Sequence, residues 1–222
     1  MPEKFHEELE NLKEATVLMG RLAEEMLKDS VAAFKEKDIE LAQMVIDQTP
    51  ELEELDYDIE EWALKLLTLY QPMATDMRTI ACILKMITYL TRIGRYGKDI
   101  AKIVLITKDT PHVAKLVEIP HMADIVEDMI DDALCTFTEC DFEEKCDIAV
   151  LDTFKNRDDE VDALMDSIIR QSITYMMENP KYITMCTRYI MVARHLERSA
   201  DHACKIAEKL YYMQSGEKKT ID

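Results

Sequence analysis

The chain of 222 residues carries 45 acidic and 27 basic side chains, which gives a formal net charge of −18 at pH 7. This negative charge repels nucleic-acid phosphates, so direct nucleic-acid binding is not expected. The sequence has only four glycines, six prolines and 48% hydrophobic residues, and its apolar positions recur every three or four residues, which predicts an all-α protein.

Six long helices are predicted, three in each half of the chain. Their expected ranges are residues 4–37, 39–70, 72–107, 113–140, 142–178 and 181–214. Asp38 and Asp141 are typical N-cap residues, and Glu144 follows Asp141 by three positions, as in a capping box.

Prolines support several of these boundaries. Pro72 and Pro180 suit the first turn of a helix, where the missing N–H group costs nothing. Pro50 lies inside the second predicted helix and should kink or break it. Thr110 and Pro111 separate the two halves.

The two halves repeat one another. Three residues of the first predicted helix and the cap that follows it recur 103 positions later: Met19, Met26, Phe34 and Asp38 match Met122, Met129, Phe137 and Asp141. Further along, the shift is 106 positions: Glu53, Glu54 and Asp56 match Asp159, Glu160 and Asp162. We therefore predict two tandem three-helix bundles, in domains 1–109 and 110–216, followed by a flexible tail at 217–222.

The N-terminus and the apolar runs indicate the compartment. The first residues lack the apolar stretch of a signal peptide, and no uninterrupted apolar run approaches the roughly 18 residues that cross a bilayer. We expect a cytoplasmic protein without membrane insertion. The six cysteines form no C-x-x-C pair and are interpreted as reduced, mostly buried residues.

The last predicted helix places two carboxylates on its apolar face. Glu197 falls on the stripe of apolar residues that runs from Cys186 to Ala207, and Asp201 lies one turn further along the same face. Two anions at the edge of a core are costly unless a cation or hydrogen-bond donors compensate them. A positive group is therefore expected nearby.

The fifth predicted helix shows the same anomaly. Asp158 interrupts its apolar stripe, and Asp159 and Asp162 lie beside it. Carboxylates on adjacent helices could supply the oxygen ligands of a metal ion, with Fe, Zn, Mn, Mg or Ca as candidates. The alternative is a salt-bridge network with three basic neighbours, Arg194, Arg198 and Lys205.

No catalytic machinery is visible. The sequence has no Gly-rich phosphate loop, G-x-S-x-G motif or H-E-x-x-H motif, so we expect no enzyme. A ferritin-like oxidoreductase would need Glu-x-x-His, but Ala200 stands three positions after Glu197. His195 and His202 lean away from the apolar stripe, which favours surface or interface positions over metal ligation.

Two segments resemble signatures of the PhoU family. They are Gln71–Arg78, QPMATDMR, and Ala193–Glu208, ARHLERSADHACKIAE, which are similar to the family's QPxxxDLR and ARHLERxxDHxxxIAE. Pro72, Asp76 and Arg78 belong to the first signature. The resemblance implies a cytoplasmic regulator of phosphate uptake that works with an ABC phosphate transporter and, in many bacteria, a sensor histidine kinase.

The resemblance also implies an acidic E(D)-x-x-x-D motif in each half, which binds metal in some members. Glu197 and Asp201 match that motif in the second half, but Thr91 and Arg95 replace its two acids in the first. A metal is therefore not expected in the first half. We expect Arg95 to pair instead with carboxylates of the neighbouring helix: Glu53, Asp56 or Glu60.

The sequence suggests three possible functions. The first is a metal-binding adaptor of a phosphate ABC transporter, and the second is an accessory subunit of another ion or phosphate permease. The third, a metal-dependent oxidoreductase, lacks its motif. Tyr211, Tyr212 and other large apolar residues on long helices favour a homodimer.

Overall fold

The computed structural model describes residues 3–72, 74–139 and 148–221. Within these ranges the chain forms seven α-helices and two short 3₁₀ helices. The α-helices are α1 (Glu3–Glu36), α2 (Ile39–Asp47), α3 (Thr49–Tyr70), α4 (Ala74–Ile106), α5 (Glu118–Glu139), α6 (Phe154–Glu178) and α7 (Ile183–Ser215), and the 3₁₀ helices are η1 (Ala149–Thr153) and η2 (Pro180–Tyr182). The all-α prediction is confirmed, and no described helix is both long and apolar enough to cross a membrane.

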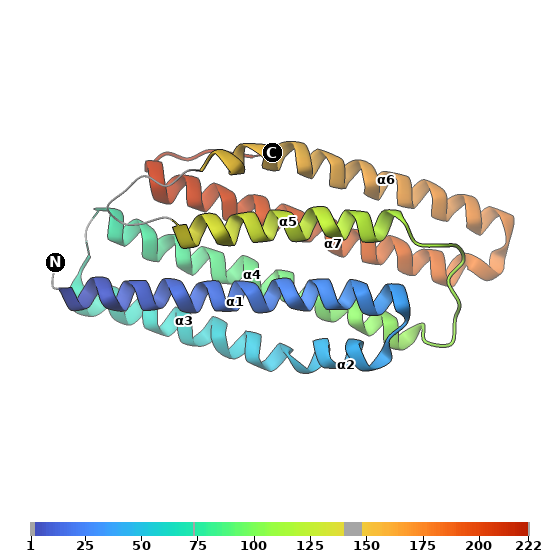
Figure 1. The fold of residues 1–222 in the computed structure, drawn as a ribbon, viewed down its shortest axis with the longest axis horizontal. Helices are drawn as coiled ribbons and strands as arrows, with labels where there is room; N and C mark the ends of the chain where they lie inside the picture. The colour runs from blue at the N-terminus through green and yellow to red at the C-terminus, as the bar shows by residue number, and fades with distance from the viewer. Residues whose placement is uncertain (1–2, 73, 140–147, 222) are drawn as a thin grey trace.

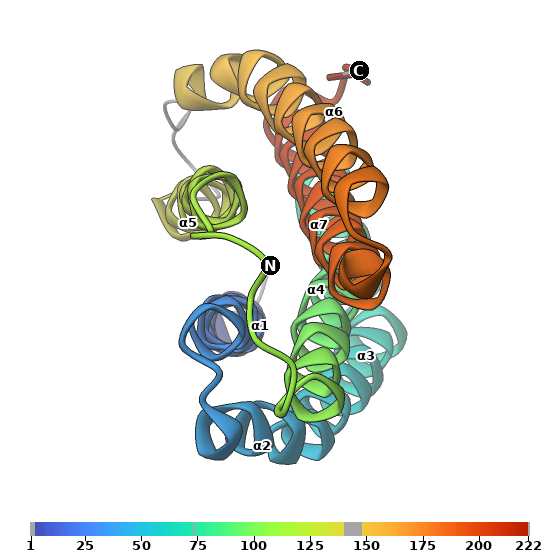
Figure 2. The same cartoon turned by 90° about the vertical axis from the view of Figure 1, so that its right-hand side faces the viewer.

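The two halves lie side by side with their helices along one long axis (Figure 1). The first half consists of α1, the broken pair α2 and α3, and α4, and the second half consists of α5, α6 and α7. Figure 2 shows α5 beside α1 and α7 beside α4, with α2 and α3 at one edge and α6 at the other. Four inner helices, α1, α4, α5 and α7, therefore form a core shared by both halves.

The repeated residues fill this shared core. All six apolar members of the first repeat pattern are buried, namely Met19, Met26, Phe34, Met122, Met129 and Phe137. Gly20 allows α1 to approach α5 closely, because a Cβ atom at this position would collide with the side chain of Leu134. The sequence repeat is thus a packing repeat.

Two predicted boundaries are confirmed at the start and in the middle of the second predicted helix. The backbone N–H of Leu41 donates to the Asp38 carboxylate at 2.9 Å, which caps α2. The predicted break near Pro50 occurs at Gln48, between the end of α2 at Asp47 and the start of α3 at Thr49.

Other boundaries differ from the prediction. The third predicted helix begins at Ala74, after Pro72, and the fourth begins only at Glu118. Residues 113–117 connect the halves without an α-helix. The N–H of Val113 donates to the Tyr189 hydroxyl at 2.9 Å, so a distant side chain holds the connection in place.

The second half begins its outer and last helices later than expected. The predicted cap at Asp141 and Glu144, and the start of the fifth predicted helix, lie outside the described residues. A 3₁₀ helix precedes α6, which begins at Phe154. Pro180 opens a 3₁₀ turn, and α7 follows from Ile183.

The C-terminal residues, expected to form a flexible tail, lie against the helices. Ile221 is only 5% exposed, and its N–H donates to the Glu208 carboxylate at 3.3 Å. Lys219 pairs with Asp152 and lies 4.1 Å from the centre of the Tyr211 ring. The buried Ile221 and the Lys219–Asp152 ion pair thus attach this mostly polar segment to the helices.

Candidate functional site

The acidic residues of α6 lie beside the adjacent helix α7, and Asp158 is the one that faces it. Asp158 is half-buried, whereas Asp159 and Asp162 are exposed. Because α6 packs along α7 (Figure 2), Asp158 lies within electrostatic reach of Asp201, and Asp162 lies within reach of Glu197. The structure therefore brings together the two acidic patterns that the sequence identified separately.

On α7 the acidic pair occupies the edge of the core. Glu197 is half-buried and Asp201, one helical turn later, is exposed. The apolar neighbours Leu196 and Ala200 are fully buried. The helical period thus places the two carboxylates at the boundary between core and solvent.

Neighbouring carboxylates raise the pKa of Asp158 and of Glu197. The pKa of Asp158 is raised to about 6, mainly by burial and further by the charges of Asp201, Asp162 and Asp159. Burial also raises the pKa of Glu197, with further contributions from Asp201 and Asp162, while Arg198 and Arg194 act in the opposite direction. The five carboxylates form one electrostatic unit, which we call the acidic cluster.

Sequence reasoning missed one member of this environment. The buried thiol of Cys204 forms a hydrogen bond with Asp158, and burial raises the pKa of that thiol, so it stays a neutral donor. Cys204 follows Asp201 by three positions and therefore shares its helix face. That spacing could have indicated that Cys204 lies near the acidic pair. A cysteine among apolar residues, however, is usually interpreted as a core residue.

The side chains of the acidic cluster are of a type that binds cations, but they are not arranged around a common point. Carboxylate oxygens are ligands for hard divalent cations, and the raised pKa of Asp158 shows that the Cys204 hydrogen bond does not fully offset its burial beside other carboxylates. Among the residues that the structure describes, however, no three His, Cys, Asp or Glu side chains converge closely enough to hold a metal. A metal would require the exposed Asp159 and Asp162 to turn towards α7.

The first half places different groups at the equivalent positions. Arg95 donates to Glu53 at 3.0 Å, one of the three carboxylates named from the sequence, and both side chains are about half exposed. Thr91 is buried, and its hydroxyl donates to the carbonyl of Ile87 in its own helix at 2.9 Å. Neither residue needs a cation.

The repeat also aligns Asp158 with Leu52, 106 positions earlier. Leu52 is fully buried, and its methyl groups occupy the space above Gly94, where a Cβ atom would collide with them. The position that holds a buried leucine in the first half thus holds, in the second half, the carboxylate whose pKa is raised to about 6.

The two histidines that flank the acidic pair lie between the halves. His202 stacks on Tyr89 and Tyr96, with ring centroids 5.6 Å and 5.7 Å apart, and His195 lies against Tyr96 at 5.5 Å. The pKa of His202 is lowered to about 4, mainly by burial and further by the charges of Arg92 and Arg198. The neutral rings serve as interface residues, as the sequence favoured.

The signature residues near the start of α4 have local contacts. His6 lies 3.8 Å from the Asp76 carboxylate, and Arg78 donates to the Thr75 hydroxyl at 3.3 Å. Pro72 is buried immediately before the helix. The His6–Asp76 contact joins the start of α4 to the start of α1.

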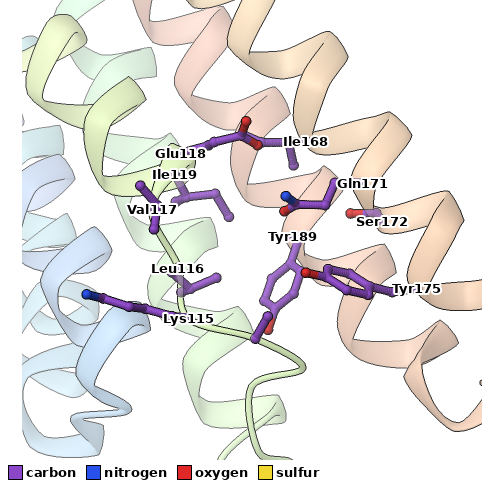
Figure 3. A pocket seen from close by; sticks show the side chains of 11 residues that line it. Lys115, Leu116, Val117, Glu118, Ile119, Ile168, Gln171, Ser172, Tyr175 and Tyr189 are labelled. Atoms are coloured by element: carbon purple, nitrogen blue, oxygen red, sulfur yellow. The ribbon is translucent and has the colours of Figure 1, made fainter.

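A small pocket lies between the connection of the halves and α6, away from the acidic cluster. Figure 3 shows Glu118 and Ile168 on one side of it and Tyr175 and Tyr189 on another. Glu118 accepts a hydrogen bond from Ser167 at 2.7 Å. The free volume of about 20 Å³ suits a single water molecule, so this pocket is not a substrate site.

Comparison with known sequences identifies relatives along the whole chain. The PhoU domain profile matches twice, over residues 16–104 and 119–210. A phosphate-specific transport system accessory protein PhoU homologue of Rhizobium meliloti is 36% identical over 213 residues, which cover 96% of this chain and 87% of the relative. The homologue of Aquifex aeolicus is 33% identical and covers 96% of this chain and 94% of its own length.

Solved structures agree with the sequence comparison. The crystal structure of PhoU from Pseudomonas aeruginosa superposes with a TM-score of 0.89 at 30% identity, covering 96% of this chain and all of that chain. The phosphate transport system regulatory protein PhoU from Streptococcus pneumoniae gives a TM-score of 0.85 at 25% identity, with coverage of 97% and 99%.

Proposed function

The chain belongs to the PhoU family, and from this premise we propose that it is a cytoplasmic accessory protein that regulates phosphate uptake by a phosphate-specific ABC transporter. The observation that supports this proposal is the extent of the match, since both halves correspond to the family domain and relatives are covered almost end to end. The family is one of non-enzymatic accessory proteins, in agreement with the expectation from sequence.

A deletion strain tests the proposal directly. Phosphate uptake and phosphate-responsive expression, including any signalling through a sensor histidine kinase, should lose their normal dependence on external phosphate. A plasmid copy of the wild-type gene should restore it. Normal regulation in the deletion strain would contradict the proposal, and an altered uptake of a different ion would favour an accessory role for another permease.

We further propose that the acidic cluster is the metal-binding part of this regulator. The cluster combines hard oxygen donors with a half-buried carboxylate whose pKa its neighbours raise, so a bound cation would offset their repulsion. Glu197 and Asp201 would hold the cation from α7, and Asp158, Asp159 and Asp162 from α6. The first half, with Arg95 beside Glu53, would hold none.

Metal analysis of tag-free protein tests this second proposal. Wild type should carry near-stoichiometric metal by inductively coupled plasma mass spectrometry, and Glu197→Gln/Asp201→Asn should lose it. The matched control is Asp56→Asn/Glu60→Gln on the equivalent outer helix of the first half, which should keep it. Equally low metal in all three proteins would make the cluster a metal-free acidic surface.

Large apolar residues on long helices also support a homodimer as part of the proposal. Tyr211 and Tyr212 are only partly buried in the single chain. These are the residues on which the sequence-based prediction of a homodimer depends. Sedimentation equilibrium at micromolar concentration would report the mass directly. A monomer at all concentrations would contradict this part alone.

A further inference from the structure

A cavity of about 330 Å³ lies between α4, the end of α7 and the C-terminal residues. Its size falls at the lower end of the range of small-molecule sites. Its walls are Ala81, Cys82 and Lys85 of α4, Glu208, Lys209 and Tyr212 of α7, and Lys218, Lys219 and Thr220 of the C-terminal segment. We call it the lysine pocket.

The lysine pocket is basic on a strongly acidic protein. Four lysines line it, although the chain as a whole has a formal charge of −18. In the part of the chain that the structure describes, Lys85, Lys209 and Lys218 have no carboxylate partner within ion-pair distance, whereas Lys219 pairs with Asp152. Three ammonium groups are thus available to an incoming anion.

The single acid of the pocket is already engaged. The Glu208 carboxylate accepts from the Lys205 ammonium at 2.9 Å and from the N–H of Ile221 at 3.3 Å. These two donors offset its negative charge, so it repels an anion less than a free carboxylate would.

The other residues that line the lysine pocket are uncharged, and some are apolar. Ala81 and the ring of Tyr212 contribute apolar surface, and the Cys82 thiol donates to the carbonyl of Lys209 at 3.3 Å. Burial raises the pKa of Cys82 to about 11, although Lys209 and Arg78 act against this, so the thiol is neutral at physiological pH. The pocket therefore combines lysines from all three of its walls with uncharged surface from Ala81, Cys82 and Tyr212.

We propose that the lysine pocket binds a small phosphorylated molecule, with Lys85, Lys209 and Lys218 on the phosphoryl oxygens. Lysine ammonium groups bind phosphate as point charges. The space beside Tyr212 accommodates a planar group, as in a nucleotide, but free inorganic phosphate shares the recognised chemistry. Because the C-terminal segment supplies one wall, binding also stabilises its attachment to the helices.

Isothermal titration calorimetry on the full chain tests the proposal with ADP and inorganic phosphate as separate probes at one ionic strength. At least one probe should bind saturably, and Lys85→Glu/Lys209→Glu should weaken it by at least tenfold. The matched control is Lys108→Glu/Lys181→Glu, whose lysines lie at the opposite end of the bundle and should leave the affinity within twofold. Circular dichroism melting checks that both variants fold.

Each outcome is decisive. Binding of ADP alone identifies a nucleotide-like ligand, and equal binding of phosphate identifies the free anion. No saturable binding of either probe, or an equal loss in the control, overturns the proposal. Deletion of residues 217–222 gives a second check, since it removes Lys218 and Lys219 and should also weaken binding. These readouts do not depend on the transporter, so their failure leaves the proposed regulatory function standing.

Discussion

The two outer helices of this duplicated chain carry the same pattern of acids but differ in what lies beneath it. In the first half Leu52 is fully buried and Arg95 pairs with Glu53. In the second half Asp158 takes the place of the leucine, and Asp201 takes the place of the arginine. The first half has the arrangement expected of a stable protein, and the second keeps an electrostatic cost of the kind that clusters at functional sites.

The largest expected effect comes from moving the second-half residue into the first half. Leu52→Asp would bury an anion with no room for water and should destabilise the fold by about 3–5 kcal/mol. Urea denaturation followed by circular dichroism measures the change. Leu64→Asp on the same helix, where the leucine is half exposed, is the control and should cost less than about 1 kcal/mol.

The reverse exchange should have the opposite sign. The raised pKa of Asp158 corresponds to about 3 kcal/mol against the folded state at neutral pH, which solvent screening at this half-exposed site reduces to about 1–2 kcal/mol. Asp158→Leu should therefore stabilise metal-free protein by about that amount at pH 7.5, as measured by denaturation. Asp159→Leu, on the exposed face, should change stability by less than about 0.5 kcal/mol. Destabilisation by Asp158→Leu would mean that the Cys204 hydrogen bond outweighs the repulsion.

A smaller, pH-dependent effect on stability is expected from His112, which lies in the connection between the halves. Burial lowers the pKa of His112, and Lys37 lowers it further, while its ring bonds to the Phe34 carbonyl at 3.0 Å and the Tyr189 hydroxyl at 3.1 Å. The unfolded chain therefore binds the proton more readily than the folded one. The stabilising contribution of His112 is complete above the unfolded pKa of about 6.5 and is lost as the pH falls below it.

This effect is measured as the stability difference between wild type and His112→Gln at pH 7.5 and at pH 5.5. The difference should shrink at the lower pH. The exposed His121→Gln is the matched control for removing a histidine. A difference that grows on acidification would contradict a neutral, half-buried His112.

The smallest expected effect concerns the ion pair of the first half. Arg95 and Glu53 are both about half exposed, so a double-mutant cycle with Arg95→Ala and Glu53→Ala should give a coupling of about 0.5 kcal/mol or less. A coupling above about 1.5 kcal/mol would indicate that the guanidinium takes over the structural task of a cation.

Many features of the two halves could be predicted from the sequence alone. The Asp38 cap and the break near Pro50 depend on residues close in sequence, and the 103-residue and 106-residue repeats are visible by comparing the chain with itself. The structure contains each of these features. The shared helix face of Glu197 and Asp201 follows from the period of one helix.

The features that were missed depend on contacts between distant residues. The hydrogen bond of Cys204 to Asp158 and the stacking of His202 on Tyr89 require the relative register of two helices, which one sequence does not contain. The non-helical connection before α5 is held by Tyr189, more than 70 positions away. The attached C-terminal segment likewise depends on the burial of Ile221.

The core shared by α1, α4, α5 and α7 has a consequence for folding. Each family repeat looks like a separate unit in sequence, but its inner face is completed only by the other repeat. Cutting the chain in the connection between α4 and α5 would leave two fragments with large apolar faces open to water. The protein should therefore unfold in one cooperative transition, and the halves should not survive as independent domains.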